Sequence, residues 1–363
     1  MNPEPMNPLP PYMQWAKTRP AARFDLANSN VLACSIEDLE GAPDRLTLSG
    51  RNDEGYVPLI EAIARRYGVA PANVATAQGT SGANFQVFAT LLGPHDEVLL
   101  ERPGYDPLAG AARLLRARVT RFDRPRESGY LLDPDRVRAA TTARTRLIVV
   151  TNAHNPTGSR AGLAELEEIG RLAESAGAHV LADEVYLDAG GGTITPAAHL
   201  GDVFISTSSL TKSYGLAALR CGWTLSSVAL AERIRRTRDV IDGTGPIVTE
   251  QLATLAFAQL DRLHERAMSL LSVNSTLARQ FLNTRTDLDW FDPGISTVLF
   301  PRVRGVEDIG RFAERLLAER ETAVVPGSFF DAPAHFRLGL GGTTESLRGG
   351  LERLGAALDE RAW

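Results

Sequence analysis

Two lysines stand out among the residues of this chain that could do chemistry. The chain has 39 basic residues, of which only Lys17 and Lys212 are lysines and the remaining 37 are arginines. A base-composition bias that favours arginine wherever a positive charge suffices would explain this ratio. A guanidinium cannot form an imine with an aldehyde, whereas an ε-amine can. We expect Lys17, in the N-terminal arm, to be solvated, which leaves Lys212 as the candidate for covalent chemistry.

Polar segments follow several of the apolar runs from which strands are predicted. They are Asn155–Gly158, Asp183–Tyr186, and Ser209–Lys212 followed by Leu219–Gly222. Taken singly, these segments have plain structural interpretations as a turn, a strand-end cap and a polar loop. Taken together, they bring polar side chains to the carboxyl ends of neighbouring strands, where open α/β sheets bind their ligands.

A further polar segment, Thr80–Asn84, lies between a predicted strand and a predicted helix. Backbone N–H groups at a helix N-terminus form an anion site, and Gly82 would allow a ligand to approach the backbone closely. An ordinary helix cap would explain the segment equally well by itself. Beside a candidate lysine, we interpret it as a phosphate-binding turn.

Alternating strands and helices must position these groups. Strands are predicted at Val74–Ala77, Glu97–Leu100, Val119–Phe122, Leu147–Thr151, His179–Asp183, Val203–Ser208 and Gly222–Leu225. Apolar repeats within residues 85–92 and 163–172 predict helices between them. The sequence therefore predicts an α/β fold with a mostly parallel seven-stranded sheet flanked by helices.

The pattern changes after Asp242, and a length of 363 residues favours two domains. Helices are predicted from Glu250 to Asn283 with a break, from Val306 to Arg320 between two short strands, and from about Thr344 to Arg361. We expect residues 46–243 to form a large domain and residues 244–363 a smaller α+β domain. Residues 1–45 would form an arm and a segment that joins the small domain.

Composition and charge exclude several kinds of partner and site. A net charge of −5 gives no electrostatic reason to expect nucleic acid or a membrane as a partner. No apolar run approaches the roughly 20 residues that span a bilayer, and residues 1–20 do not resemble a signal peptide. The two cysteines have no metal-ligand spacing and form no disulfide framework, and we expect no metal and a cytoplasmic location.

The motifs together resemble the fold-type I pyridoxal 5'-phosphate (PLP) enzymes, specifically the class I/II aminotransferases. The resemblance extends from Gly55–Leu59, through Asn155–Gly158 and the Lys212 segment, to Val325–Phe329 and Phe336–Leu338. It implies an enzyme that moves an amino group between an amino acid and a 2-oxo acid through a Schiff base on Lys212. It also implies a homodimer.

The resemblance also implies roles for residues around the cofactor ring. Lys212 would carry the cofactor and later move a proton at the substrate α-carbon. Asp183 would pair with the pyridine nitrogen and favour its protonated form. Asn155 and Tyr186 would bind the phenolic oxygen, and Tyr105 would stack on the ring.

Further roles concern the two anionic groups. Ser209, Arg220 and the backbone of Ser81, Gly82 and Ala83 would hold the cofactor phosphate. Arg337, together with Asn155, would bind the substrate α-carboxylate, since a guanidinium can bond two oxygens at once. By itself, Arg337 would be interpreted as a surface arginine on an edge strand.

The sequence departs from the family pattern at three places. Gly50 stands where the family often has a tyrosine that reaches the partner subunit's cofactor phosphate, and Arg51 or Asn52 could replace it. The run Leu26–Val31 lacks the usual Gly-x-Pro and is slightly more similar to histidinol-phosphate aminotransferases. Ala153 replaces a usual proline. These changes leave the substrate open.

Two other functions share the same motifs. One is a different PLP reaction, catalysed by a β-lyase, a decarboxylase or a cyclising synthase. The other is a sensor module that binds PLP without catalysis, which is the weaker hypothesis because all the catalytic positions are filled. The sequence therefore favours an aminotransferase but identifies neither donor nor acceptor.

Overall fold

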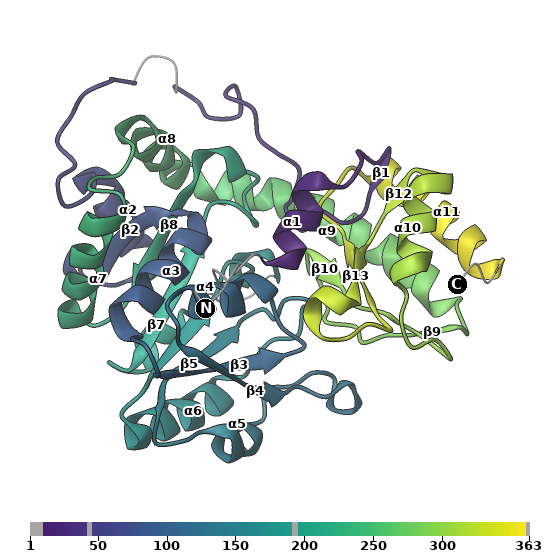
Figure 1. Cartoon of the computed structure of the whole chain (residues 1–363). Coiled ribbons are helices and arrows are strands. Elements are labelled where there is room, and N and C mark those ends of the chain that lie inside the picture. Colours follow the sequence, from purple (N-terminus) through teal and green to yellow (C-terminus); the bar gives the residue numbers. More distant parts are fainter. Residues whose placement is uncertain (1–9, 42–45, 191–194, 361–363) are drawn as a thin grey trace, which may run out of the picture.

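A seven-stranded sheet forms the larger part of the molecule (Figure 1). The computed structural model describes residues 10–41, 46–190 and 195–360. The strand order is β2-β8-β7-β6-β5-β3-β4. The strands are β2 (Val74–Gln78), β3 (Glu97–Arg102), β4 (Arg118–Asp123), β5 (Thr145–Thr151), β6 (His179–Asp183), β7 (Phe204–Ser209) and β8 (Cys221–Leu225). All neighbours are parallel except those that β8 forms with β2 and β7. The predicted mostly parallel sheet is therefore confirmed.

Central strands such as β5 are apolar on both faces because helices cover both sides of the sheet. Leu147 and Val149 pack with Phe88 in one core, whereas Ile148 and Val150 pack with Ile169 in another. Successive side chains of a strand point to opposite faces, so this continuous apolar run serves both cores.

Seven helices of the described residues accompany this sheet. They are α2 (Val57–Tyr67), α3 (Gly79–Leu91), α4 (Asp106–Leu114), α5 (Pro134–Ala140), α6 (Leu163–Ala176), α7 (Val228–Ile241) and α8 (Ile247–Ala258). The apolar residues at every third position, Leu163, Leu166, Ile169 and Leu172, predict one face for α6, but the buried face differs from it. Leu163 is 52% exposed, while Leu166, Ile169 and Ala173 are buried. A repeat of three residues drifts around a helix with 3.6 residues per turn, so not every member of the repeat faces the core.

The smaller part consists of three helices and short strands. The helices are α9 (Leu260–Asn283), α10 (Gly310–Arg320) and α11 (Thr344–Asp359), and the strands are β9 (Leu288–Asp289), β10 (Val298–Leu299), β11 (Arg302–Val303), β12 (Thr322–Ala323), β13 (Val325–Pro326) and β14 (Phe336–Gly339). β10, β14 and β13 form an antiparallel sheet in which β14 is central. The predicted break in the long helical region is confirmed at Gln259, between α8 and α9.

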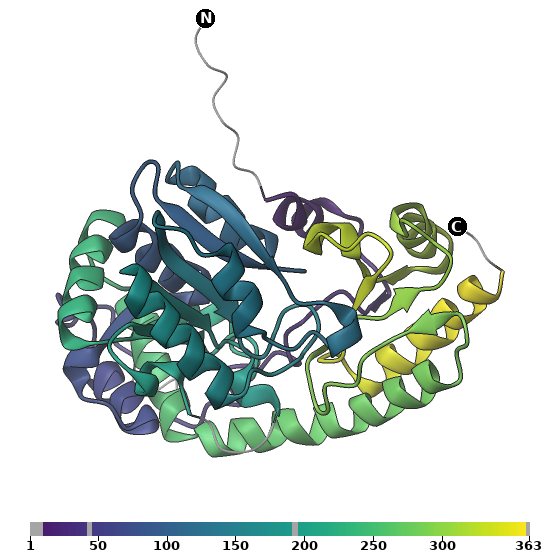
Figure 2. The same ribbon diagram turned by 90° about the horizontal axis from the view of Figure 1, so that it is seen from below.

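Helix α9 extends along both parts of the molecule (Figure 2). Leu260 and Leu263 belong to a core beside the large sheet, whereas Leu271 and Leu282 belong to the core of the smaller part. The division of the chain after residue 243 remains a prediction, and α8 packs against α2 beside the large sheet.

Helices α10 and α11 have bounds that differ from the predicted ones. The helix expected from Val306 begins at Gly310, because the side chain of Asp308 accepts a hydrogen bond from the Gly310 N–H at 2.7 Å and holds the preceding residues in a turn. Helix α11 ends at Asp359, and Arg361 lies outside the described residues.

The N-terminal segment contains a helix that the sequence did not indicate. Helix α1 (Pro11–Thr18) lies where the two parts of the molecule meet (Figure 1). After it, β1 (Phe24–Asp25) pairs in parallel with β12 of the smaller part. Residues 1–9 and 42–45 of the predicted arm lie outside the described residues. Among the helices described, none is both long and apolar enough to cross a membrane.

Candidate active site

A cavity of about 440 Å³ opens at the carboxyl ends of the central strands. Most of the residues predicted for the site line this cavity, namely Ser81, Tyr105, Asn155, Asp183, Tyr186, Ser209, Lys212, Arg220 and Arg337. They come from segments spread over more than 250 positions of the sequence, which the parallel sheet gathers at one edge.

Of the residues predicted to hold the phosphate, Gly82 and Ala83 do not line the cavity, and their role there stays a prediction. Helix α3 begins at Gly79, so these two residues lie within its first turns and not in a loop before it, and Ala83 is fully buried. Thr80 and Ser81 line the cavity instead. In an α-helix only the first few N–H groups lack an intrahelical partner, so the N–H groups that remain for an anion lie before Gly82.

Lys212 lies beyond the end of β7, and its amine contacts the N-terminal segment. Its Nζ donates to Asn30 Oδ1 at 2.7 Å and to Ser29 Oγ at 3.0 Å. Burial lowers the pKa of Lys212 to about 8, because a charged ammonium loses hydration there. A substantial part of the amine is therefore neutral near pH 8, and the neutral form is the nucleophile and base.

Asp183 ends β6, and its carboxylate is held by donors on both oxygens. Asn84 Nδ2 donates to Oδ2 at 2.8 Å, and the Val185 N–H donates to Oδ1 at 3.2 Å. Asn84 is itself oriented by Thr207, whose hydroxyl donates to Asn84 Oδ1 at 2.6 Å. Burial raises the pKa of Asp183, and the bond from Asn84 opposes that rise. The sequence placed Asn84 only in the phosphate-binding segment, because its contact with Asp183 spans 99 positions.

Arg337 is completely buried in the central strand β14, and is not a surface residue on an edge. Its Nη1 donates to Asn155 Oδ1 at 3.0 Å, and its Nη2 donates to the hydroxyl of Tyr12 at 2.9 Å and to the carbonyl of Ala27 at 3.1 Å. Its Nε is buried and has no hydrogen-bond partner among the described residues. A buried donor without a partner is costly, so the guanidinium is ready to take a further acceptor.

Tyr186, Asn155 and Tyr105 complete the wall around Lys212. The Tyr186 hydroxyl donates to Ser29 Oγ at 3.0 Å, and the Lys212 amine lies 5.8 Å from the Tyr186 ring centroid. The carbonyl oxygen of Asn155 accepts from Arg337. Tyr105 packs edge-on against Tyr12, with ring centroids 5.7 Å apart. The polar ends of Tyr186 and Asn155 thus have partners within the chain.

Hydroxyls and an arginine gather near the N-terminus of α3. Thr80 Oγ1 donates to Ser209 Oγ at 2.9 Å, and both residues line the cavity beside Ser81 and Arg220. Gly79 has a φ of +72°, and a Cβ built there would lie 2.4 Å from Arg220 Nη2, so the approach of this arginine requires glycine. Hydroxyls, a guanidinium and a helix N-terminus together form a suitable donor set for a phosphate group. These residues therefore fit the expected cofactor.

A buried ion pair supports the loop that carries Asn155. Arg124 Nη1 lies 2.8 Å from Glu101 Oε2, and both side chains are almost fully buried. Glu101 Oε1 accepts from the Thr151 N–H at 2.8 Å, and the Thr151 hydroxyl accepts from the Asn155 N–H at 3.0 Å. Each group in this series depends on the next, so the ion pair helps to fix the position of Asn155.

Helix α1 contributes four residues to the cavity lining, Tyr12, Met13, Ala16 and Lys17. The expectation for Lys17 needs refinement: its side chain is exposed, yet it borders the same cavity as Lys212. Because the chain has only two lysines, Lys17 could have been predicted as a second lysine of the site. Both lysines of the chain therefore lie at one cavity.

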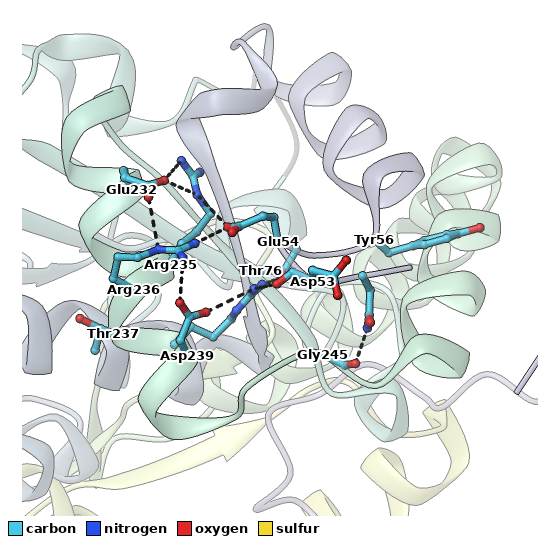
Figure 3. Close-up of polar contacts among 12 residues, drawn as sticks. Asp53, Glu54, Tyr56, Thr76, Glu232, Arg235, Arg236, Thr237, Asp239 and Gly245 are labelled. Carbon is cyan, nitrogen blue, oxygen red and sulfur yellow. Dashed lines mark hydrogen bonds and ion pairs between the residues drawn. The ribbon is translucent and has the colours of Figure 1, made fainter. Parts of the chain in front are cut away.

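The segment around Gly50 is anchored to α7 and α8. The carboxylate of Glu54 lies between Arg235 and Arg236 (Figure 3), and Arg238 Nη2 donates to the carbonyl of Asp53 at 3.0 Å. Asn52 donates to the carbonyl of Gly245 and to Glu250 Oε2. Asn52 is thus engaged within its own subunit, whereas the side chain of Arg51 is 95% exposed. Of the two residues suggested to replace the tyrosine, Arg51 is the better placed to reach another chain.

The chain matches the model of a known protein family and is similar to several known proteins. Residues 35–354 match the model of the family described as aminotransferase class I and II. The chain is 29% identical to the capreomycidine synthase of Streptomyces vinaceus, over 98% of this chain and 95% of that protein. It is similar to a PLP-dependent aminotransferase from Streptococcus suis 89-1591, with a TM-score of 0.90 and 26% identity over 96% of each chain. It is also similar to the PLP-dependent cyclase OrfR, with a TM-score of 0.88 and 25% identity over the whole of both chains.

Proposed function

Since the chain belongs to the class I and II aminotransferase family, whose members depend on PLP, we propose that it transfers an amino group between an amino acid and a 2-oxo acid. The observation that carries this proposal is the buried guanidinium of Arg337. Its Nε has no hydrogen-bond partner among the described residues, and Arg337 lines the cavity that also holds Lys212 and Asp183. A clamp for an α-carboxylate beside an amine of lowered pKa suits chemistry at an amino-acid α-carbon.

Four groups of side chains would hold the cofactor. Lys212 would bind its aldehyde carbon, Asp183 would face its ring nitrogen, and Tyr105 would cover its ring. Ser209, Arg220 and the first turn of α3 would bind its phosphate. When bound, PLP supplies an electron sink for the electron pair left at the α-carbon after a bond there breaks.

Side chains of the protein would orient the substrate and transfer the proton. Arg337 would bind the α-carboxylate through its fork and so orient the α-carbon toward Lys212. The ε-amine of Lys212, whose pKa of about 8 keeps much of it neutral, would accept the α-proton and then return a proton to complete the transfer. Asp183, whose two oxygens accept hydrogen bonds from Asn84 and Val185, would favour a positive charge on the ring nitrogen.

A single-turnover experiment tests this proposal. The holoenzyme is mixed with an excess of an amino donor without any acceptor. We expect one equivalent of 2-oxo acid per subunit and neither ammonia nor carbon dioxide, because the amino group stays on the enzyme until an acceptor arrives. Sustained ammonia release would instead indicate a lyase, and carbon dioxide a decarboxylase. A protein that binds PLP but transforms no amine would fit the sensor hypothesis.

A cyclising synthase is the second candidate function. The capreomycidine synthase aligns with nearly the entire chain, and OrfR matches its whole length. A cyclisation needs the same proton removal from the α-carbon but returns the nitrogen to the product. In the single-turnover experiment such an enzyme would consume its amino acid catalytically without an acceptor, and would release neither 2-oxo acid nor ammonia.

Replacing Arg337 by Lys tests the carboxylate clamp. Lysine keeps the charge but loses the fork, so we expect kcat/KM for every amino donor to fall by about 1.5–3 kcal/mol, the range for hydrogen bonds to charged groups. The cofactor should still bind, since Arg220 serves its phosphate. Arg220→Lys is the matched variant and should weaken cofactor binding instead. An unchanged kcat/KM in Arg337→Lys would place the clamp elsewhere.

We also propose that the active unit is a homodimer, in which Arg51 extends toward the partner subunit. Leu48, close to Arg51, is 91% exposed in the single chain, and a large exposed apolar side chain beside an anchored segment suits an interface. Sedimentation at assay concentration should give the mass of two chains. A fully active monomer would contradict this proposal.

A further inference from the structure

A second cavity, of about 660 Å³, lies between α1 and α10 of the smaller part. It is separate from the active-site cavity, because no described residue lines both. At about 100° of turn per residue, the two cavities border opposite faces of α1. The active-site cavity is lined by Tyr12, Met13, Ala16 and Lys17, and the second cavity by Trp15, Thr18 and Arg19. The proposed function uses only the first of these faces.

One face of α10 forms the opposite wall of the second cavity. The residues of this wall are spaced three and four positions apart, as on one side of a helix. They are Gly310, Ala313, Glu314, Leu317 and Ala318, with Glu321 directly after the end of α10. The other side of α10 packs into the core of the smaller part through Phe312 and Leu316. Three of the wall residues are small, and they leave the space in front of α1.

The base of the second cavity is apolar. Trp15 and Phe329 lie with their ring centroids 5.5 Å apart, and Val324 and Pro326 of the smaller part continue the lining. A mostly apolar hollow of this volume with a few polar groups at its edge is typical of sites for small molecules. The body of a ligand here would therefore be aromatic or aliphatic.

Charge decides which kind of ligand fits. Among the described residues of the lining, the charged ones are Arg19, Glu314 and Glu321. Arg19 Nη2 donates to Asp25 Oδ2 at 2.7 Å, so the charge of Arg19 is already paired. Glu314 and Glu321 are exposed, and within the described part of the chain neither side chain has an ion pair or a hydrogen bond. The cavity thus has an excess of negative charge, which favours a cation, and the ring of Trp15 would add cation–π attraction.

Helix α1 connects the second cavity with the carboxylate clamp. On its other face, the hydroxyl of Tyr12 accepts from Arg337 at 2.9 Å. Strand β13 makes a second connection, since Pro326 lines the second cavity while Val325 pairs with Arg337 of β14. A ligand that holds α1 against the smaller part would therefore also hold Tyr12 at Arg337.

We propose that the cavity between α1 and α10 is a second ligand site, which takes a small molecule with an apolar body and one cationic group. The apolar body lies against Trp15, Leu317 and Phe329, and the cation faces Glu314 and Glu321. Occupancy of this site stabilises α1 in its docked position and so regulates the active site from the opposite face of the same helix.

Calorimetric titration of the holoenzyme with ligands that differ in charge tests the site without turnover. The ligands are N,N-dimethylbenzylamine, benzyl alcohol and phenylacetate. The amine is tertiary, so it forms no imine with the cofactor. We expect one amine to bind per subunit, about 5- to 20-fold more tightly than benzyl alcohol, as two exposed ion pairs would provide. Phenylacetate should bind more weakly than the alcohol.

Variants on α10 assign this binding to the second cavity. Glu314→Gln and Glu321→Gln should each lower the preference for the amine about 2- to 5-fold. Glu319→Gln is the matched control, since Glu319 is exposed beside the same helix face but does not line the cavity, and it should leave the preference unchanged. Ala318→Trp places a bulky side chain in the hollow and should abolish binding. Equal binding of all three ligands, no binding of the amine, or binding that survives Ala318→Trp overturns the proposal.

Proteolysis after lysine tests the effect on α1. Of the two lysines of the chain, Lys17 is exposed in α1, whereas Lys212 lies in the active site. A protease specific for lysine should therefore cut first after Lys17, when α1 opens locally. Since the ligand binds the docked helix, N,N-dimethylbenzylamine at ten times its Kd should slow this cut about tenfold, but not in Ala318→Trp. An unchanged rate in the wild type would show that occupancy does not stabilise α1, and would overturn the regulatory role.

Discussion

Replacing Lys212 by Arg should abolish turnover, with a loss in kcat of at least about 10⁴-fold. General base catalysis alone contributes about 10²–10⁴-fold, and the variant also loses the amine that binds the cofactor covalently. Arginine keeps the positive charge and much of the volume, so the fold should survive, which circular dichroism and the melting temperature would verify. A variant that retains substantial activity would show that another group performs the proton transfer.

The same residue should be the one that borohydride links to the cofactor. Peptide mapping of the reduced holoenzyme should find the label on Lys212 and not on Lys17, although both border one cavity. Lys17→Arg is the matched variant and should still be labelled. Because burial lowers the pKa of Lys212 to about 8, cofactor attachment to the apoenzyme should quicken about tenfold per pH unit up to that pH and then level off. A label on Lys17 would contradict the assignment.

Asp183→Asn should give the second largest loss, about 10- to 1,000-fold in kcat. An opposite charge nearby shifts a pKa by about 1–3 units, and each unit represents about 1.4 kcal/mol. Without the carboxylate, the ring nitrogen of the cofactor would hold its proton less firmly and withdraw electrons less strongly. The variant should still bind PLP, because the phosphate contacts remain.

The neighbouring Glu184 provides the control for Asp183. Burial raises the pKa of Glu184 to about 8, and its Oε1 accepts from the Ala197 N–H at 2.8 Å. Since Glu184 does not line the cavity, Glu184→Gln should keep near-normal kcat. If Asp183→Asn also kept its kcat, the carboxylate would have no role in catalysis. Measurements of kcat at saturating donor with full cofactor occupancy decide the question.

The sheet could be predicted from the sequence because its strands are buried on both faces. A continuous apolar run such as Leu147–Val150 is a strong local signal, and the polar residues that follow it lie at the carboxyl end of the strand. Lys212 could be predicted for a different reason, since a base-composition bias made the remaining lysines conspicuous. Arg337 could be predicted only through its resemblance to a family, because nothing in its local sequence distinguishes it from 36 other arginines.

The parts that could not be predicted depend on contacts between distant segments. Lys212 contacts Asn30 across 182 positions, and Arg337 contacts Tyr12 across 325 positions. Helix α1 has only eight residues, too few for an apolar repeat of the kind by which longer amphipathic helices are detected. The start of α3 was misplaced because Gly79, which has a positive φ, begins the helix without a side-chain cap.

Helix α1 has only eight residues, fewer than the roughly 12–15 that an isolated helix needs to be even marginally stable in water. Its order must come from packing, chiefly from Tyr12 and Trp15 against Phe329, with ring centroids 6.0 and 5.5 Å apart. Such a segment opens by local unfolding at a small fraction of the global free energy. Its amides should therefore exchange with deuterium early, while those of β5 exchange late. A ligand that contacts α1 in the active-site cavity would stabilise the closed form of this helix by an amount that grows with ligand concentration relative to Kd. Slower amide exchange in α1 would then report that the cavity is occupied.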